Sequence, residues 1–283
     1  HTLNFPIDMF FESLAMDAAE RAVAVVLSGT GSDGTRGIRA VKENNGMVMV
    51  QEPATAKFDG MPRSALSTGV ADFVLHPDQM AEQLHAFIEH PAVQRQLGQE
   101  KSTDDLPEMG RILSLVNQSS QIDFKQYKPT TVVRRIERRM SINQLGDLAD
   151  YASLLRNDPR EVEQLCRELL IGVTKFFRDS EAFEIVNEQI IPDLLDNLGS
   201  DRSLRVWVPG CSTGEEAYSL GILLLEQIER RQVKDVELRI FGTDVDKRAI
   251  DFASAATYPE SIAADVERHR LEKYFVHHNE NYQ

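Results

Sequence analysis

The 283 residues include 31 Lys and Arg against 45 Asp and Glu, a net charge of −14 at pH 7, with 42% hydrophobic and 27% charged residues. This composition is that of an ordinary globular protein of about two domains, and its acidity argues against nucleic-acid binding. Cys166 and Cys211 are too few for a disulfide framework or a zinc site, so we expect no metal centre. Without a visible signal peptide or membrane-spanning run, we expect a cytoplasmic protein with no direct membrane insertion.

The first 85 residues alternate between helical and strand patterns, which predicts an α/β segment. We expect helices over Pro6–Ala19 and Thr35–Asn44, and strands over Ala22–Leu27, Met47–Gln51 and Ala71–Leu75. A glycine-rich loop, Ser28–Thr35, follows the first strand but lacks the Gly-Lys-Ser/Thr of a phosphate-binding P-loop. Its acidic residue, Asp33, is placed to cap the following helix at Thr35, which is its simplest role.

An all-helical module is predicted for residues 108–183, after a helix and linker over 86–107. Within it, the basic residues Arg134, Arg135, Arg138 and Arg139 repeat at i, i+1, i+4 and i+5. This spacing stacks them along one helix face. The face is either solvated, with local ion pairs, or it holds an acidic partner; a nucleic-acid-binding helix would be expected to interleave aromatic residues.

The stretch Arg205–Leu225 predicts a buried strand, a tight turn between Gly210 and Gly214, and a helix. Such a turn presents backbone amides at the carboxyl end of a strand, where doubly wound sheets bind nucleotides. Glu215 and Glu216 in the first helical turn would repel a pyrophosphate but suit a positively charged ligand. S-adenosylmethionine, with an ammonium, a sulfonium and no phosphate, fits this pattern. Alternatively, both glutamates only favour the helix dipole.

The next predicted strand, Glu237–Asp246, ends in two aspartates. An acidic residue at the end of the second strand of a nucleotide-binding unit accepts hydrogen bonds from ribose hydroxyls. An aspartate there could also cap the predicted helix Lys247–Ala255, so Asp244 and Asp246 could serve one role each.

Three ordered motifs resemble the chemotaxis receptor glutamate methyltransferases of the CheR type: Val173-Thr-Lys-Phe-Phe-Arg-Asp179, Val208-Pro-Gly-Cys-Ser-Thr-Gly-Glu-Glu-Ala-Tyr-Ser-Leu220 and Gly242-Thr-Asp-Val-Asp246. The resemblance runs from about Met109 to the end. It implies methyl transfer from S-adenosylmethionine to glutamate side chains in the cytoplasmic domain of a chemoreceptor, whose acidic helices would meet the arginine face. Thr174 and Arg178 would contact the cofactor, with Arg178 near the reacting centre, alongside Gly210, Glu215 and Asp244. Some relatives carry a side-chain amide where this chain has Gly172, so that contact is lost or made by backbone.

The motif Gly29-Thr-Gly-Ser-Asp-Gly-Thr35, followed by Phe58-Asp-Gly-Met-Pro-Arg-Ser-Ala65, resembles the carboxyl-terminal part of the CheB-type chemotaxis methylesterases. The resemblance implies that Asp33 completes a Ser-His-Asp triad and that the amide of Thr30 contributes to the oxyanion hole. The serine and histidine of that family lie before the point where this sequence starts, and His1 is not in a matching motif. We therefore expect no esterase activity from these residues alone.

The expected fold is α/β: a partial doubly wound methylesterase domain (1–85), the helix and linker, the all-α module, and a partial Rossmann-like methyltransferase domain (184–283). The parent would be a fusion cut at both ends. Two other functions stay open. Gly210-Cys-Ser-Thr-Gly214 matches the nucleophile elbow of α/β-hydrolases, with Ser212 as nucleophile and His269, His277 or His278 downstream. A fragment that binds receptor or cofactor without turnover is the other.

Overall fold

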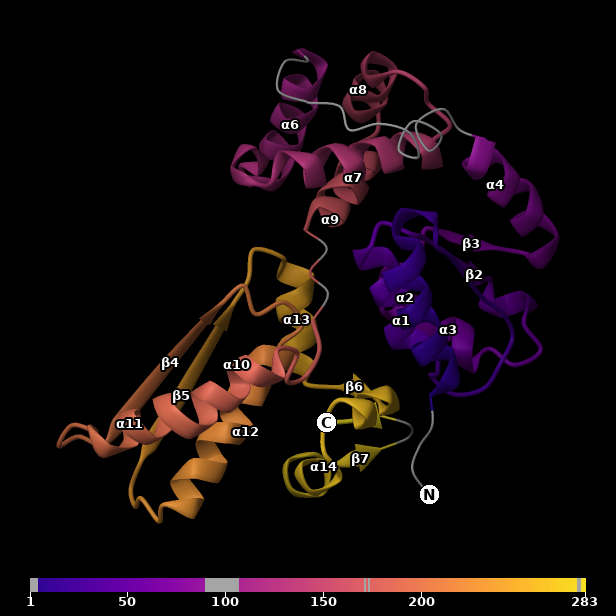
Figure 1. The fold of residues 1–283 in the computed structure, drawn as a ribbon. Coiled ribbons are helices and arrows are strands. Elements are labelled where there is room, and N and C mark those ends of the chain that lie inside the picture. The colour runs from indigo at the N-terminus through magenta and orange to yellow at the C-terminus, as the bar shows by residue number, and fades with distance from the viewer. Residues whose placement is uncertain (1–4, 90–106, 171, 173, 279–280) are drawn as a thin grey trace. The chain divides into compact units, whose positions relative to one another are not determined.

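The computed structural model describes residues 5–89, 107–170, 172, 174–278 and 281–283. The chain divides into two compact units (Figure 1): an N-terminal unit, Pro6–Ile171, and a C-terminal unit that includes Gly172–Gln283. Most of the predicted helix and linker over 86–107 lies outside the described residues, which omit 90–106. The bounds of the four predicted segments stay predictions.

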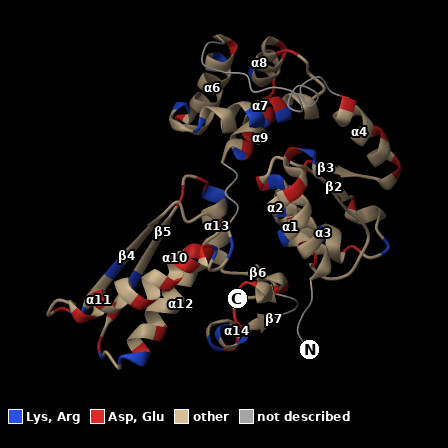
Figure 2. Ribbon diagram, in the orientation of Figure 1, with Lys and Arg blue, Asp and Glu red and all other residues tan. Residues whose placement is uncertain are grey.

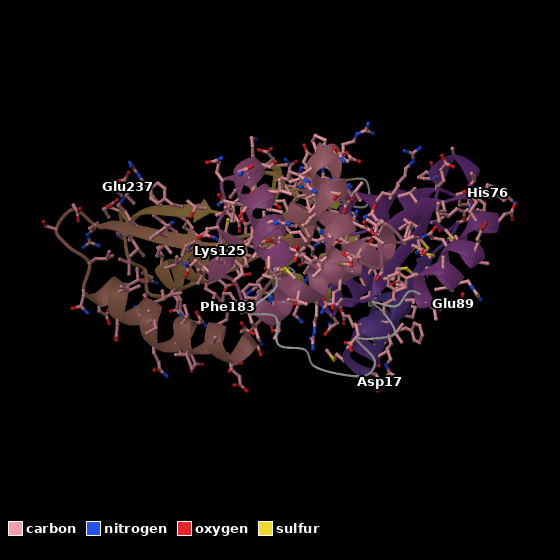
Figure 3. All side chains as sticks on the ribbon, turned by 90° about the horizontal axis from the view of Figure 1, so that it is seen from above. Asp17, His76, Glu89, Lys125, Phe183 and Glu237 are labelled. Carbon is pink, nitrogen blue, oxygen red and sulfur yellow. The ribbon has the colours of Figure 1, made fainter. Side chains whose placement is uncertain are left out.

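A parallel sheet forms the first half of the N-terminal unit, with strands in the order β1 (Val23–Val26), β2 (Met47–Gln51) and β3 (Phe73–Leu75). The helices are α1 (Pro6–Ala18), α2 (Thr35–Glu43), α3 (Gly60–Ser67) and α4 (Pro77–Glu89), with short 3₁₀ turns at Ala19–Arg21 and Pro53–Thr55. Figure 3 labels His76, which precedes α4, and Glu89, which ends it.

The central strand β2 is buried along its whole length because helices cover both of its faces. Val48 and Val50 belong to the hydrophobic cluster that includes α1 and α2. Met47 and Met49 alternate with them and contact the other helix, α4, through a second cluster. A continuous apolar run is typical of such a strand, which confirms the α/β prediction for this segment.

Two aspartates cap the first turns of α1 and α2: Asp33, in the loop before α2, caps α1, and Asp8, in α1, caps α2. The Asp33 carboxylate accepts hydrogen bonds from the backbone amides of Ile7 (3.1 Å) and Asp8 (2.9 Å), in the first turn of α1. The Asp8 carboxylate accepts one from the amide of Gly37 (2.8 Å), in the first turn of α2. A Cβ on Gly37 would lie 2.5 Å from the Cβ of Phe11, so this approach requires glycine. We call the arrangement the reciprocal caps.

Asp8 makes the stability of this unit depend on pH. The side chain is buried, and burial raises its pKa from 3.8 to about 6, against the amide of Gly37. Between these two values the folded protein holds a proton that the unfolded chain has lost, so this contribution to stability falls as pH rises. We expect the free-energy advantage of the wild type over Asp8→Asn to fall by about 2 kcal/mol between pH 4 and pH 6.5.

Urea unfolding of both proteins across that pH range, followed by circular dichroism, measures the difference. Comparing the two proteins removes contributions from other groups, because those groups are common to both. A difference in unfolding free energy that stays constant with pH would contradict the raised pKa.

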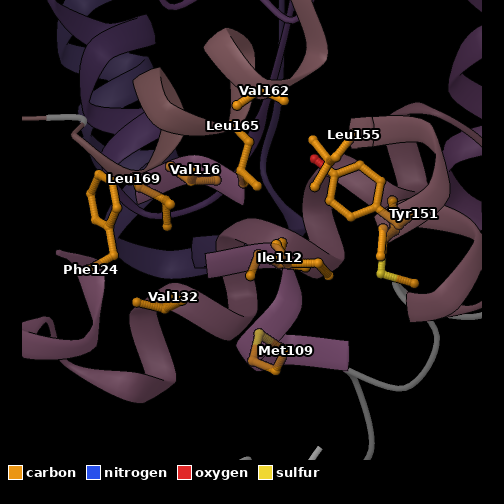
Figure 4. Close-up of a cluster of buried hydrophobic side chains, with 13 residues drawn as sticks. Met109, Ile112, Val116, Phe124, Val132, Tyr151, Leu155, Val162, Leu165 and Leu169 are labelled. Carbon is orange, nitrogen blue, oxygen red and sulfur yellow. The ribbon is translucent and has the colours of Figure 1, made fainter. Parts of the chain in front are cut away.

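The described residues of the second half of the N-terminal unit are helical, as the sequence predicted: α6 (Pro107–Ser120), α7 (Pro129–Ile142), α8 (Leu148–Asn157) and α9 (Pro159–Leu169), with a 3₁₀ turn at Phe124–Gln126. Their apolar faces meet in one core (Figure 4), in which Ile112, Ile136 and Leu165 are fully buried. Asp158 accepts the amide of Arg160 and so caps α9. We call these helices the helical module.

In the C-terminal unit, β4 (Ser203–Pro209) and β5 (Glu237–Thr243) form a parallel pair. The helices are α10 (Ser180–Ile185), α11 (Ile191–Asp196), α12 (Glu215–Arg230), α13 (Lys247–Ala255) and α14 (Arg268–Tyr274), with a π-helical turn at Val186–Ile190 and a 3₁₀ helix at Glu260–Ala264. A small antiparallel sheet has the order β6 (Tyr258–Pro259), β8 (Asn281–Tyr282) and β7 (His277–His278). The predicted strand Glu237–Asp246 stops at Thr243, since Asp244 and Asp246 turn the chain into α13.

The two faces of the β4–β5 pair differ. One face joins the core with α11 and α12 through Leu204, while the other leaves Trp207 69% exposed and Phe241 42% exposed. Glu237, at the start of β5, is also exposed (Figure 3). Among the described residues, no helix is long and apolar enough to cross a membrane.

Candidate functional site

The carboxyl ends of β4 and β5 meet at one edge because Pro209 lies opposite Thr243 in the parallel register. There, the turn between β4 and α12 follows a left-handed path at Gly210 (φ 69°), Ser212 (φ 47°) and Gly214 (φ 97°). The amide of Cys211 donates to the carbonyl of Thr243 at 3.0 Å, which ties the turn to β5. This is the strand, turn and helix that the sequence predicted, except that β4 is buried on one face only and not throughout.

The two aspartates after β5 have separate roles. Asp244 accepts hydrogen bonds from the amides of Ser212 and Asp246, both at 2.8 Å, so its carboxylate holds the turn after β4. Asp246 accepts from the amide of Arg248 at 2.9 Å and caps α13. Asp244 is therefore the aspartate at the edge shared by the two strands.

Carboxylates give this edge a negative field. Glu215 is buried and accepts a hydrogen bond from the hydroxyl of Thr213 at 2.6 Å, whereas Glu216 is exposed. Burial, together with the charges of Asp244, Glu216 and Glu215, raises the pKa of the Cys211 thiol. Burial disfavours any charge here, but the carboxylates of Asp244, Glu215 and Glu216 disfavour an anion such as a phosphate more than a cation. These carboxylates fit the ammonium and sulfonium of S-adenosylmethionine.

The segment that carries Thr174 and Arg178 is tied to the same turn. The hydroxyl of Ser212 donates to the carbonyl of Gly172 at 3.1 Å. Phe177 has a positive φ of 50°, and its amide donates to the hydroxyl of Ser219 at 3.1 Å. Thr174 is half-buried and Arg178 is exposed.

Three residues that support this site were not singled out by the sequence analysis. Tyr258, fully buried, donates its hydroxyl to the carbonyl of Thr213 at 2.7 Å. Ser219 links Phe177 to α12 by donating to the carbonyl of Glu215 at 2.7 Å. Arg270 lies over the ring of Phe177 at 4.7 Å while it forms a two-bond pair with Glu226. Apart from the bond from Ser219 to Glu215 within α12, these contacts join segments far apart in sequence, so no local pattern indicated them.

Ser212 lacks the surroundings of a hydrolase nucleophile within the part of the chain that the structure describes. Its hydroxyl donates to the carbonyl of Gly172, and among the described residues it makes no hydrogen bond to a histidine. His269 pairs with Glu267 and Glu226, and His277 with Glu260. The hydrolase alternative has no base in place.

In the N-terminal unit, Asp33 caps α1 and not the helix at Thr35, because Ile7 and Asp8 donate to its two oxygens. The carboxylate is half-buried, and each oxygen keeps a second lone pair. Two backbone donors fix its orientation, which is what an aspartate that supports a histidine requires. Thr30 is exposed on the same loop.

The four arginines of α7 do not form one exposed face. Arg134 is exposed, but Arg135, Arg138 and Arg139 are buried at 5%, 3% and 8% exposure. Figure 2 shows the basic residues of α7 beside acidic residues of α9. Arg139 makes two hydrogen bonds to Glu161, which also accepts from Tyr151 at 2.8 Å.

Arg138 is enclosed by acceptors from two parts of the N-terminal unit. It donates to Glu168 of α9 at 2.9 Å, and to Asp72 and the carbonyl of Gly46 from the α/β segment. The four arginines therefore do not form one exposed face, because carboxylates distant in sequence cover three of them. The receptor-binding role of the four arginines stays a prediction.

Comparison with known proteins assigns three regions of the chain. Residues 1–84 match the family model "CheB methylesterase", residues 107–170 match "CheR methyltransferase, all-alpha domain", and residues 172–283 match "CheR methyltransferase, SAM binding domain". The last match contains the acidic turn described above, and it confirms the S-adenosylmethionine prediction at the level of the family.

Individual relatives match most of the chain or a part of it. The chain is 41% identical over 295 residues to an uncharacterized 104.1 kDa protein in the hypE 3′ region of Rhodobacter capsulatus, covering 97% of this chain and 31% of that protein. It is 26% identical over 171 residues to a chemotaxis protein methyltransferase of Borreliella burgdorferi, covering 59% of this chain and 60% of the relative. It is also 40% identical over 82 residues to a protein-glutamate methylesterase/protein-glutamine glutaminase of Moorella thermoacetica, covering 29% and 19%.

Among solved structures, the CheB methylesterase catalytic domain of Thermotoga maritima matches 27% of this chain and 41% of its own, at 35% identity and a TM-score of 0.27. The chain spans about a third of the Rhodobacter protein and about 60% of the Borreliella methyltransferase. Motifs and family models agree on one order of segments, so residues 1–84 belong to the CheB methylesterase family and residues 107–170 and 172–283 to the CheR methyltransferase family.

Proposed function

We propose that the C-terminal unit binds S-adenosylmethionine at the turn Gly210–Gly214, and that the protein is a protein-glutamate O-methyltransferase acting on chemoreceptors. The observation that carries the proposal is the set of carboxylates around this turn, which suits a cationic nucleotide and disfavours a phosphate. The match to a family described as SAM binding supports it. The receptor's cytoplasmic domain as partner, and a cytoplasmic location, belong to this proposal.

Each residue of the site has a stated role in this proposal. Asp244 holds the turn and accepts hydrogen bonds from ribose hydroxyls, and Glu215 supplies negative charge beneath the turn. Gly210 lets the backbone approach the ligand. Thr174 and Arg178 lie on the segment tied to the turn by Ser212, and Arg178 binds a carboxylate through its guanidinium fork.

The proposed reaction needs no general acid or base from the protein. S-adenosylmethionine, when bound, supplies an electrophilic methyl group. A glutamate side chain is ionised at pH 7 and is a competent nucleophile without a general base. The protein's task is to align the carboxylate and keep water away, which Arg178 serves by orienting the substrate carboxylate.

For the methylesterase segment, we propose that Asp33 is the acidic member of a triad whose serine and histidine are not among these residues. The segment alone would then hydrolyse no methyl ester. The alternative for the whole chain, a receptor- or cofactor-binding protein without turnover, predicts cofactor binding with no methyl transfer.

Calorimetric titration with S-adenosylhomocysteine tests the proposal. We expect micromolar binding by the intact chain, and binding at least about tenfold weaker in Asp244→Asn, equal to about 1.4 kcal/mol or more. Asparagine keeps an acceptor for the amide of Ser212 but removes the charge. The control is Asp246→Asn, which removes the same charge from the cap of α13 and should bind as the wild type does.

Absence of binding by the intact chain would contradict the assignment of the cofactor to this unit. Equal affinity in Asp244→Asn and wild type would place the ligand away from the turn. A methyl-transfer assay with a glutamate-rich receptor peptide then separates the enzyme from the non-catalytic alternative.

A further inference from the structure

A cluster of buried charges joins the CheB segment to the helical module within the N-terminal unit. Its members are Lys42, Asp72, Arg135, Arg138 and Glu168, and we call it the bridge cluster. Lys42 lies 2.5 Å from carboxylate oxygens of both Asp72 and Glu168. Arg138 pairs with the same two carboxylates. Asp72 of the CheB segment and Glu168 of the helical module are thus each paired with Lys42 of the CheB segment and with Arg138 of the helical module.

The contact continues beyond these charges. Arg138 also donates to the carbonyl of Gly46, at the entry to β2, at 3.0 Å. Asp72 is fixed on its own side by the amide of Val48 at 2.8 Å. Ile142, at the end of α7, packs against the cluster that contains Met47. The CheB segment therefore occupies the buried face of α7.

The bridge cluster is not fully satisfied. It holds one more cation than carboxylates, and Arg135 is the member with the poorest contacts. Its nearest carboxylate oxygen, from Glu168, is 3.7 Å away. Among the described residues, its Nε and Nη1 have no hydrogen-bond partner although both are buried. A buried guanidinium without its hydrogen bonds is unfavourable, so this contact is weaker than its number of charges suggests.

We propose that the CheB segment is an intramolecular occupant of the basic face of α7, and that an acidic polypeptide competes with it for Arg135 and Arg138. In the closed arrangement, which the structure shows, Asp72 of the CheB segment pairs with Arg138. In the open arrangement the CheB segment has left α7, and carboxylates of the partner replace Asp72 and supply Arg135 with the acceptors it lacks. The partner is a glutamate-rich helix or chain.

The competition depends on the partner's charge. A glutamate side chain carries the carboxylate that replaces Asp72, whereas its methyl ester is neutral and does not. The identity of the partner rests on the proposed function. If the partner is the receptor, the competition gives the enzyme a preference for unmethylated over methylated receptor segments. The contact between the CheB segment and the helical module would then open for an unmethylated receptor segment and stay closed for a methylated one.

The test measures binding of fluorescently labelled poly-L-glutamate to the intact chain by anisotropy. We expect weak binding by the wild type, which has a net charge of −14, and binding at least about tenfold tighter by Asp72→Asn. Glu12→Gln is the matched control, because it removes one carboxylate of the same segment that pairs with Arg36 outside the cluster. The variant with Asp72→Asn, Arg135→Gln and Arg138→Gln together should lose the gain.

Equal affinities in Asp72→Asn, Glu12→Gln and wild type would overturn the proposal, as would a gain that survives loss of the two arginines. If Asp72→Asn does not fold, hydrogen exchange of the wild type decides. Saturating poly-L-glutamate should then speed exchange of the Val48 amide, which is bonded to Asp72, and unchanged exchange would overturn the competition. Neither readout involves cofactor or methyl transfer, so a failure of the proposed function is detected separately.

Discussion

Glu168→Gln should lower the free energy of unfolding of the N-terminal unit by about 3–5 kcal/mol. Glu168 is buried and pairs with Lys42, Arg138 and Arg135. Although burial opposes its ionisation, Arg138 and Lys42 hold its pKa below the usual range, so it is a carboxylate in the folded protein. Replacing it with a neutral amide leaves three buried cations facing one carboxylate.

Urea unfolding followed by circular dichroism, with hydrogen exchange to locate the change, measures this effect. The control is Glu163→Gln on the same helix, whose pairing with Arg167 is exposed and should be worth less than about 1 kcal/mol. Similar losses in the two variants would mean that the bridge cluster is solvated and contributes no more than a surface ion pair.

Gly214→Ala should destabilise the C-terminal unit by about 3 kcal/mol and abolish binding of S-adenosylhomocysteine. Gly214 has φ 97°, which strains any other residue, and a Cβ there would lie 2.9 Å from the Cβ of Ala253 and 3.0 Å from the hydroxyl of Tyr258. That hydroxyl holds the carbonyl of Thr213, so relief of the clash moves the turn itself.

Gly210→Ala is the matched control for stability. Its φ of 69° is also positive, but nothing lies within 4 Å of the added Cβ, so only the backbone strain of about 1 kcal/mol is expected. Fluorescence of Trp207, the single tryptophan of the chain, follows unfolding of this unit directly. Equal losses at the two glycines would show that the turn is not closed against α13 and β6.

The parts of the fold that the sequence predicted well are those decided by local pattern. β2 was predicted with its observed bounds, Met47–Gln51, since an apolar run of four residues and Gln51 lie between turn-forming residues. The sequence predicted that one of Asp244 and Asp246 caps the helix after β5, and the structure shows Asp246 as the cap. The ribose-binding role of Asp244 stays a prediction.

The parts that it missed are decided by contacts between distant segments. The periodicity of Arg135, Arg138 and Arg139 shows that they share a helix, but not that Glu161, Glu168 and Asp72 cover them. A charged residue is exposed more often than not, so the helix was taken as a surface. Likewise, Asp33 was expected to cap the nearest helix, whereas it caps α1, 26 residues away in sequence.

The reciprocal caps have a consequence for the order of folding. The first amides of α1 find their acceptor on a loop that follows β1, and the acceptor for Gly37 lies back on α1, a separation of 29 residues. The first amides of both helices lack their acceptors until the chain between Asp8 and Gly37 has formed a loop. The entropic cost of closing that loop must therefore be paid before either cap contributes to stability. Helix α1 is therefore a late-stabilised element whose formation waits for β1 and the loop after it, although it comes first along the chain.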